Sequence, residues 1–276
     1  MSRSYLFIPG NTPSMIQNLD VFEADAVIID FEDSVIDYDK DSARDLVTSF
    51  LEKYNFDNTL LYIRVNDVES DDFLNDILST IDLDINGYVL PKALPKSVDI
   101  LNEILDQHNC KKHIIPIIES PMAVLRAEEI AVKKNVSALL LGAEDLTKEL
   151  SIKRTLEASE ILFTRSKIVL VANAYKIDSI DTPFTDKDNT EELRIDCLNA
   201  KQLGFTSKSL IHPNQVDVVN ELFSPTIDEI NFALKVIAKS KNENKGAFSL
   251  DGKMIDLPII KKAKKTITEA KKYNLI

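Results

Sequence analysis

Eight short apolar runs recur along the chain, and each is followed by a longer stretch with the spacing of an amphipathic helix. This alternation is typical of parallel β/α units rather than of hairpins. The apolar runs predict strands at residues 4–9, 26–30, 60–65, 87–91, 113–118, 138–142, 178–181 and 208–212. The stretches between them predict helices near residues 13–22, 40–54, 70–80, 96–107, 122–134, 155–175, 188–203 and 213–222.

Prolines support two of the helix starts, at Thr12-Pro13 and at Ser120-Pro121. Proline is tolerated in a first turn because the amide hydrogen that it lacks would have no partner there. Eight β/α units, in a chain of 276 residues, predict one α/β domain folded as a (β/α)8 TIM barrel, which typically spans about 250 residues. A doubly wound open sheet is the alternative.

The C-terminal part of the chain is not needed for eight units. We therefore predict a barrel at residues 1–224 and a helical extension at residues 225–276, with helices near 226–242 and 257–273. The polar segment between these helices contains the motif GKMID. Such an extension either packs beneath its own barrel or reaches over that of a neighbouring subunit.

The charge balance narrows the range of partners. A net charge of −12 and an isoelectric point near 4.8 disfavour nonspecific attraction to nucleic acid or to an anionic membrane. The sequence shows neither a signal peptide nor an apolar run near the roughly 18 residues of a membrane span. Cys110 and Cys197 are too few for a disulfide framework. We expect a cytoplasmic protein that binds neither nucleic acid nor membranes.

Polar residues gather where the predicted strands end, which is where β/α barrels build their active sites. They are Asn11; Asp30, Glu32 and Asp33; Arg64 and Asn66; Lys92; Glu119 and Ser120; Glu144 and Asp145, after Gly142 and Ala143; Asp181; and His212, after Ile211. We expect these side chains to meet at one mouth of the barrel.

Glu119 and Asp145 follow consecutive strands, and neighbouring strands lie only about 4.8 Å apart. Their carboxylates can therefore converge on one ion. Ligands that are all oxygen favour a hard cation such as Mg²⁺, which completes its octahedron with water and substrate. The alternative is that each carboxylate caps the helix that follows it.

Arg64 lies within an apolar run, where an unpaired guanidinium would be costly, so it requires an anionic partner. Either it forks onto a substrate carboxylate or enolate, or it forms a buried pair with Glu32 or Asp33. Asp30, Glu32 and Asp33 crowd one strand end, which raises a pKa by mutual repulsion unless a cation or Arg64 is close.

Two further side chains remain open from the residues alone. Lys92, like Arg64, is a cation at a strand end that requires an anionic partner, although the argument is weaker for it. Together with Asp30, Glu32 and Asp33, it is expected to surround the metal ligands rather than to bind the metal. His212 is either a hydrogen-bond donor to substrate or a structural side chain at a strand end.

Ordered motifs then reveal a resemblance. They are SYLFIPGNTP, AVIIDFEDSV followed by Lys40 and Ala43-Arg44, LLYIRVN, GYVLPK, IIPIIES, GAEDL, SIDTPF, GF followed by Lys208 and LIHPNQ, and GKMID. In this order and spacing, from about Arg3 to Asp256, the chain resembles the citrate lyase β-subunit family, which includes malyl-CoA and citramalyl-CoA lyases.

The resemblance implies a trimeric barrel enzyme that cleaves or forms the bond between an acyl thioester and a 2-oxo acid such as oxaloacetate. By matched motif it makes Glu119 and Asp145 the Mg²⁺ ligands, Arg64 the anchor of the oxo acid, and Asp256 an acid/base on the extension. Without the resemblance, Asp256 is interpreted as the cap of a helix that begins at Leu257-Pro258.

The same family reading extends to substrate contacts. The amides of Gly142, Ala143 and Glu144 are expected to cradle a substrate carboxylate at a helix start. Ile211 and His212, in LIHPNQ, are expected to contact substrate as well.

Two departures from the family pattern bear on the substrate. The first loop and helix carry Thr12, Ser14, Met15 and Asn18 in place of basic residues that would meet the phosphates of coenzyme A, so the thioester is carried either by CoA or by an acyl-carrier protein. Ser207 replaces a glycine before the eighth strand. Competing functions are a metal-dependent aldolase of free hydroxy-oxo acids and a non-catalytic subunit that binds a dicarboxylate.

Overall fold

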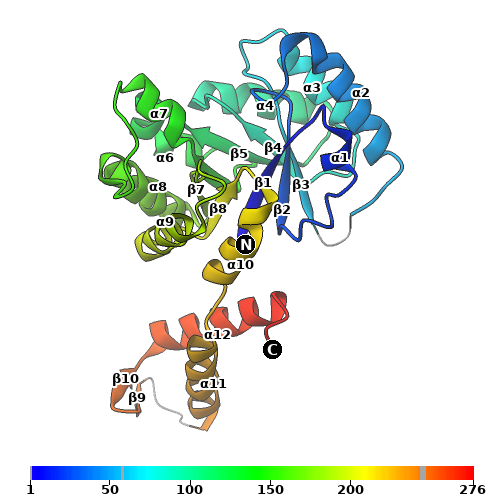
Figure 1. The fold of residues 1–276 in the computed structure, drawn as a ribbon. Coiled ribbons are helices and arrows are strands. Elements are labelled where there is room, and N and C mark those ends of the chain that lie inside the picture. Colours follow the sequence, from blue (N-terminus) through cyan, green and yellow to red (C-terminus); the bar gives the residue numbers. More distant parts are fainter. Residues whose placement is uncertain (1, 57–58, 243–246) are drawn as a thin grey trace. The chain divides into compact units, whose positions relative to one another are not determined.

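A computed structural model of the chain describes residues 2–56, 59–242 and 247–276. Eight parallel strands form a closed barrel in chain order. The first strand, β1 (Ser4–Pro9), pairs with the last, β8 (Ser207–Leu210), through the register Tyr5↔Ser209. This pairing closes the sheet (Figure 1). The predicted (β/α)8 barrel is therefore confirmed, and the alternative of an open doubly wound sheet is wrong.

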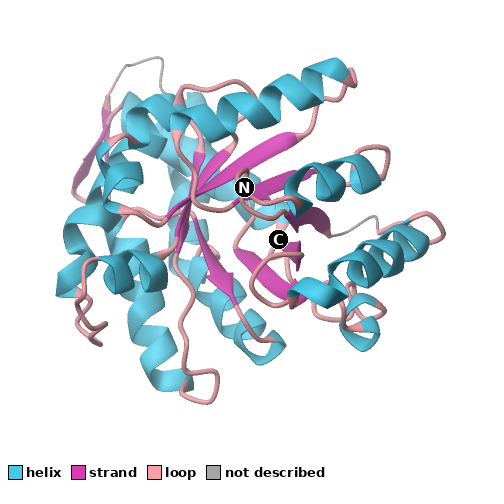
Figure 2. Cartoon of the chain, turned by 90° about the horizontal axis from the view of Figure 1, so that it is seen from above, coloured by secondary structure: helices cyan, strands magenta, loops and turns pink. Residues whose placement is uncertain are grey.

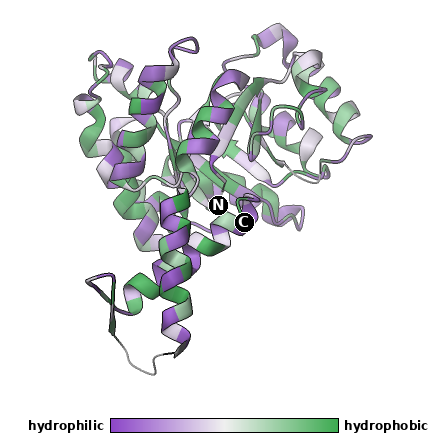
Figure 3. Ribbon diagram, turned by 60° about the horizontal axis from the view of Figure 1, so that its bottom comes forward, coloured by the Kyte–Doolittle hydropathy of each residue, from purple (hydrophilic) through white to green (hydrophobic). Residues whose placement is uncertain are grey.

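The other barrel strands begin where the apolar runs predict them, and each ends at or one residue before the predicted position. They are β2 (Ala26–Asp30), β3 (Leu60–Arg64), β4 (Gly87–Leu90), β5 (His113–Ile118), β6 (Ala138–Leu141) and β7 (Asp178–Asp181). Side chains that point inward pack into one cluster in the barrel interior. Its members are Tyr5, Ala26, Ile28, Tyr62, Val89, Ile115, Ile117, Ala138, Leu140 and Ile180. Figure 3 shows hydrophobic residues along these strands.

Helices surround the strands (Figure 2). The α-helices of the barrel are α1 (Pro13–Ile16), α2 (Lys40–Leu51), α3 (Asp72–Thr80), α4 (Pro95–Gln107), α5 (Pro121–Leu125), α6 (Ala127–Ala131), α7 (Ala143–Glu149), α8 (Leu162–Tyr175), α9 (Thr190–Leu203) and α10 (Val216–Phe223). Short 3-10 turns precede α2, α8 and α10: η1 (Asp37–Asp39), η2 (Ser159–Ile161) and η3 (Pro213–Gln215).

Several helices differ from those predicted, and α8 begins at Leu162 rather than near residue 155. The first ends at Ile16 rather than near residue 22, and Asn18 donates a hydrogen bond from its side chain to the Ser14 carbonyl, a local bond that competes with a regular helix. The helix predicted over 122–134 divides at Arg126 into α5 and α6. Helix α7 is not among the eight helices predicted from periodicity, because seven residues are too few to display a helical period, although a helix start near Gly142 to Asp145 was expected.

The chain divides into two compact units, Met1–Asn220 and Glu221–Ile276. In the second unit α11 (Ile227–Asn242) and α12 (Leu257–Lys272) pack together with a hairpin, β9 (Phe248–Leu250) and β10 (Lys253–Ile255). The hairpin turns at Asp251-Gly252, whose φ angles of 48° and 77° suit an Asp-Gly turn. Among the described residues, no helix combines the length and apolarity needed to cross a membrane.

Candidate active site

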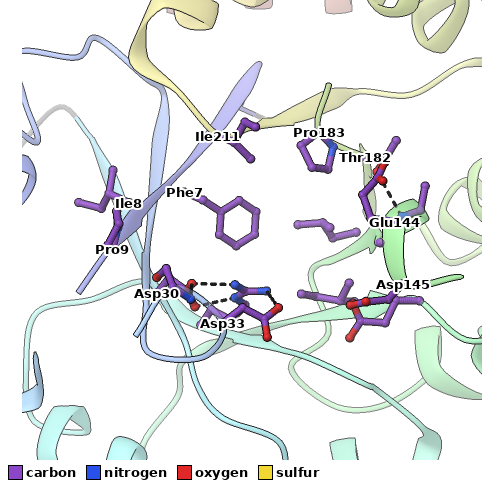
Figure 4. A pocket seen from close by; sticks show the side chains of 17 residues that line it. Phe7, Ile8, Pro9, Asp30, Asp33, Glu144, Asp145, Thr182, Pro183 and Ile211 are labelled. Atoms are coloured by element: carbon purple, nitrogen blue, oxygen red, sulfur yellow. Dashed lines mark hydrogen bonds and ion pairs between the residues drawn. The ribbon is translucent and has the colours of Figure 1, made fainter. Parts of the chain in front are cut away.

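A cavity of about 400 Å³ opens at the C-terminal ends of the barrel strands. Its lining combines an apolar wall with several acids and one cation. The lining residues are Phe7, Ile8, Pro9, Asp30, Asp33, Ser34, Arg64, Ile117, Glu119, Leu140, Gly142, Ala143, Glu144, Asp145, Thr182, Pro183 and Ile211. Figure 4 shows Asp30 and Asp33 on one side and Asp145 on the other.

The period of two along a strand explains which residues reach this cavity. Alternate side chains of a strand point to the same face, so the position two residues beyond an inward core residue also points inward. Ile28 is followed in this way by Asp30, Tyr62 by Arg64, and Ile117 by Glu119. The same step takes Tyr5 to Phe7, Leu140 to Gly142, and Ile180 to Thr182. The site is thus the layer directly above the apolar core of the barrel.

Arg64 is held on several sides. Its Nε and Nη2 each donate to one carboxylate oxygen of Asp30 at 2.7 Å, the bidentate geometry that makes such pairs strong and directional. Its Nη1 lies 2.9 Å from Glu32 Oε2 and 3.6 Å from Asp33 Oδ2, and its guanidinium carbon lies 5.1 Å from the ring centre of Phe7. Arg64 therefore forms the predicted ion pairs with Glu32 and Asp33, but its main partner is Asp30.

The three clustered acids differ in their electrostatics. Burial raises the pKa of Asp30, but the charge and hydrogen bonds of Arg64 outweigh it, so the net shift is downward. Burial also raises the pKa of Glu32, and although Arg64 opposes the effect, repulsion from Asp33 and Glu119 contributes to a value of about 8. The cluster thus holds more negative charge than Arg64 alone compensates.

Glu119 lies at the end of β5 and is buried. Burial is the main cause that raises its pKa to about 7; the backbone amide of Lys92 donates to Oε1 and lowers it, and the nearby charge of Asp145 raises it again. The tight fit around Glu119 explains the glycine at position 142, since a Cβ there would lie 2.6 Å from the Cβ of Glu119. Glu119 and Asp145 therefore face the same space and repel each other.

Neither carboxylate caps the helix that follows it. The cap of α5 is the Ser120 side chain, which accepts from the amide of Ala123 at 3.1 Å. The cap position of α7 is Gly142, and Asp145 lies inside the first turn. The alternative that Glu119 and Asp145 serve as caps therefore does not describe these two helices.

The donor set at this point fits a divalent cation held by two carboxylates. Within the described residues, no group of three or more His, Cys, Asp or Glu side chains is arranged to enclose a metal. Mg²⁺ does not require one, because it commonly takes one or two carboxylates and keeps water or substrate as its other ligands. A cation would also offset the repulsion that raises the pKa of Glu119.

The amides at the start of α7 are partly engaged. The amide of Gly142 donates to the Ile118 carbonyl at 3.1 Å, and that of Ala143 donates to the Thr182 hydroxyl at 3.2 Å. Glu144 lines the cavity and pairs through its side chain with Arg154 at 2.7 Å. Of the three amides expected to cradle a carboxylate, two are thus already bonded within the chain.

Lys92 and His212 lie outside the cavity lining. The Lys92 ammonium is 3.7 Å from Glu32 Oε1 and 3.5 Å from Asp67 Oδ2, so it supports the acid cluster at the edge of the site. The Nδ1 of His212 accepts from the amide of Asn214 and caps η3, which is the structural alternative for this residue. Ile211, beside it, does line the cavity.

Asp256 belongs to the second compact unit. It occupies the cap position of α12, where its side chain accepts from the amide of Ile259 at 3.2 Å. The cap is thus present in the structure.

Sequence reasoning missed Phe7, Thr182 and Pro183. Phe7 points inward from β1, and Thr182, the residue after β7, points inward as well. The two-residue alternation along a strand could have predicted both. Reasoning from the strand ends singled out Asp181 instead. That side chain points the other way and is fully buried in an ion-pair network with Arg165 and Lys208.

Comparison with known proteins decides the family. The family model described as HpcH/HpaI aldolase/citrate lyase matches residues 3–213. The chain belongs to this family. The chain is 34% identical to citrate lyase subunit beta of Escherichia coli (strain K12), over 97% of this chain and 93% of that protein. It is 30% identical to mitochondrial citramalyl-CoA lyase of Homo sapiens, over 97% and 85%.

A solved structure extends the family likeness to the fold. The protein CitE from Mycobacterium tuberculosis, in complex with magnesium, acetoacetate and coenzyme A, matches with a TM-score of 0.81 and 27% identity, over 98% of each chain. Membership of the HpcH/HpaI aldolase/citrate lyase family confirms the family resemblance, and with it the expectation of a lyase.

Proposed function

We propose that the protein is a magnesium-dependent carbon–carbon lyase that cleaves or forms a 3-hydroxyacyl thioester, such as citryl-, malyl- or citramalyl-CoA. The products of cleavage are a 2-oxo acid, such as oxaloacetate, and an acyl thioester. The observation that carries the proposal is the convergence of Glu119 and Asp145 in one cavity that also holds Arg64. The magnesium in the related CitE structure supports the metal.

In this proposal Glu119 and Asp145 hold Mg²⁺. When bound, the ion supplies a Lewis acid for the substrate oxygen that becomes the ketone. Two features of the chain orient these ligands. The backbone amide of Lys92 donates to Glu119, and Asp145 lies in the first turn of α7. Asp30, Glu32, Asp33 and Lys92 surround these groups and do not bind the ion themselves.

Arg64 holds the carboxylate of the oxo acid. Asp30 fixes one edge of the guanidinium with two bonds, which leaves Nη1 to face Glu32 and Asp33. Asp33 is the more distant of these partners, and its side chain is 69% exposed. A substrate carboxylate can therefore take the place of Asp33 without uncovering a buried charge, and the bidentate bond to Asp30 keeps Arg64 oriented meanwhile.

The apolar wall protects the reactive thioester. Cleavage moves the electrons of the carbon–carbon bond onto the carbon next to the thioester, which gives an enolate that must be protonated. Phe7, Ile117, Leu140, Pro183 and Ile211 line the same cavity and limit the access of water to that carbon.

Asp256 is proposed as the acid/base that exchanges a proton with the substrate, on the strength of the GKMID motif. Asp256→Asn should leave oxo-acid binding unchanged, measured by calorimetry, while turnover falls at least about 100-fold, the usual share of a general acid or base. Asp251→Asn, in the turn of the hairpin that precedes Asp256, is the matched control and should retain full activity. A fully active Asp256→Asn variant would remove this residue from the mechanism.

We further propose that Gly142, Ala143 and Glu144 contact the substrate through their backbone and that Ile211 and His212 contact it at the rim. Because Gly142 and Ala143 already donate to other groups, the Glu144 amide is the strongest of the three candidates. His212→Ala should therefore raise KM only slightly, since its Nδ1 accepts from the backbone amide of Asn214.

The enzyme is also proposed to be a homotrimer, as the resemblance implies. Helices α5 and α8 expose large apolar side chains: Leu125 is 63% exposed, Phe163 68% and Leu170 70%. Lys167, on the same face of α8 as Phe163 and Leu170, donates to the Leu125 carbonyl, so these side chains form one apolar surface of the kind that packs against another copy. Light scattering should give three times the mass of the chain, and a monomer would contradict the proposal.

The most informative test of function is a screen with citryl-, malyl- and citramalyl-CoA, with and without Mg²⁺, that monitors release of the oxo acid. We expect cleavage of at least one thioester, abolished by chelation. The same screen is repeated with acyl-carrier thioesters and with free hydroxy-oxo acids. Cleavage of only the first would identify a carrier-bound substrate, and cleavage of only the second would identify an aldolase of free acids. A dicarboxylate that binds without turnover of any substrate would identify a non-catalytic subunit and overturn the proposal.

A further inference from the structure

Four charged side chains form a buried network behind the cavity. Arg165 on α8 donates from Nε and Nη2 to the two oxygens of Asp181, at 2.9 and 2.8 Å, and from Nη2 to Asp196 on α9 at 2.6 Å. Lys208 on β8 donates to Asp181 at 2.7 Å and to Asp196 at 2.6 Å. All four are buried, and Lys208 is fully inaccessible to solvent. Two cations thus balance two anions.

Such a network is a poor source of stability. Removing charges from water is expensive, and apolar side chains of similar volume often serve a core as well or better. A positional role is one use that such buried networks serve in proteins. The geometry of this network fixes β7, β8, α8 and α9 relative to one another at the end of the barrel where the cavity opens.

One bond leads from the network to the cavity. The third hydrogen bond of Lys208 goes to the backbone carbonyl of Thr182 at 2.7 Å. Thr182 is fully buried and lines the cavity, and its hydroxyl accepts from the amide of Ala143 at 3.2 Å. Ala143 is the first residue of α7, and Asp145 lies two residues further on.

This connection compensates for a missing helix cap. The cap position of α7 is Gly142, which has no side chain to accept from the first amides of the helix. A serine, threonine or aspartate would normally be used there, but Glu119 leaves no room for a Cβ. Thr182, from the neighbouring β/α unit, supplies the accepting oxygen instead.

We propose that Thr182, held by Lys208, is a positioning residue that caps α7 from the neighbouring unit and so orients Asp145 for metal binding. The inference rests on the proposed function, because it assigns Asp145 to the Mg²⁺ site. Groups that orient metal ligands typically change metal affinity about 10- to 100-fold when they are lost.

The test is Mg²⁺ affinity, measured by calorimetry on the full chain without substrate. Thr182→Val removes the hydroxyl and keeps the shape, and it should weaken Mg²⁺ binding about 10-fold. Thr182→Ser restores the oxygen and should return affinity to within about threefold of the wild type. Thr206→Val is the matched control: its hydroxyl bonds to Ser179 at the start of β7, and its loss should leave Mg²⁺ affinity unchanged.

The outcomes separate this inference from the function on which it rests. If the wild type binds Mg²⁺ and Thr182→Val binds it equally well, the inference is wrong and the metal site stands. If the serine variant fails to restore affinity, the hydroxyl is not the positioning group. If the wild type binds no Mg²⁺, both proposals fail. Lys208→Met should reproduce the effect of Thr182→Val where it folds, as judged by circular dichroism.

Discussion

Glu119 and Gly142 approach so closely that a Cβ on Gly142 would lie 2.7 Å from Oε2 of Glu119 and 2.8 Å from Cγ2 of Ile117. The φ angle of Gly142 is −97°, so it is the space and not the backbone conformation that requires glycine. Gly142→Ala should therefore displace Glu119 and weaken Mg²⁺ binding at least about 10-fold, measured by calorimetry.

Gly252→Ala is the matched control for this substitution. An added Cβ at Gly252 meets nothing within 4 Å, but the φ of 77° makes alanine strained there. The control should lose about 1 kcal/mol of stability and keep its Mg²⁺ affinity. If Gly142→Ala binds Mg²⁺ as tightly as the control, the close approach of Glu119 does not define the site.

Arg64→Lys should lose the bidentate bond to Asp30, because an ammonium cannot match two parallel carboxylate oxygens. We expect a loss of about 2 kcal/mol in the free energy of unfolding, measured with urea, and weaker binding of the 2-oxo acid. Arg126→Lys is the control, since Arg126 makes the same bidentate pair with Glu129 on the surface, where solvent screens such a pair and its loss should change stability little. Equal effects at both positions would contradict the role of Arg64.

The buried network predicts sensitivity to acid. Burial raises the pKa of Asp196, but Lys208 and Arg165 outweigh it and hold the value at about 2. A carboxyl whose pKa is lowered by folding stabilises the protein fully above its unfolded pKa, near 4, and loses that contribution as the pH falls through the folded value. The free energy of unfolding should therefore drop between about pH 4 and pH 2.

Asp196→Asn identifies the source of that drop. The variant should lose about 3–5 kcal/mol at neutral pH, because Lys208 and Arg165 keep a single shared anion, and its stability should vary less between pH 4 and pH 2. Asp188→Asn, at an exposed surface acid, should retain the wild-type profile. An acid profile that is unchanged in Asp196→Asn would contradict the assignment.

Much of the fold is readable from the sequence because the barrel repeats one simple pattern. Buried parallel strands are usually continuous apolar runs, and β1 to β6 coincide closely with such runs. The last two strands, β7 (DSID) and β8 (SKSL), are short and largely polar. The hairpin β9–β10 was missed because its strands have three residues each, although Asp251-Gly252 carries a hairpin signal.

The site was only partly predictable because side-chain partners depend on register. Strand ends brought Glu119, Asp145 and Arg64 to one mouth correctly. The choice of Asp30 as the main partner of Arg64 follows from the pairing Asp30↔Arg64 between β2 and β3, which places the two side by side and cannot be read without the register. Thr182 was missed since its role depends on the cap that Gly142 lacks.

The central claim is that Glu119 and Asp145 form one Mg²⁺ site. Calorimetric titration of Mg²⁺ into the wild type, Glu119→Gln and Asp145→Asn tests it most directly, with Asp188→Asn as a surface control. We predict one ion bound per chain by the wild type and by the control, and no measurable binding by either of the other two variants. Mg²⁺ binding that is unchanged in both Glu119→Gln and Asp145→Asn would contradict the account.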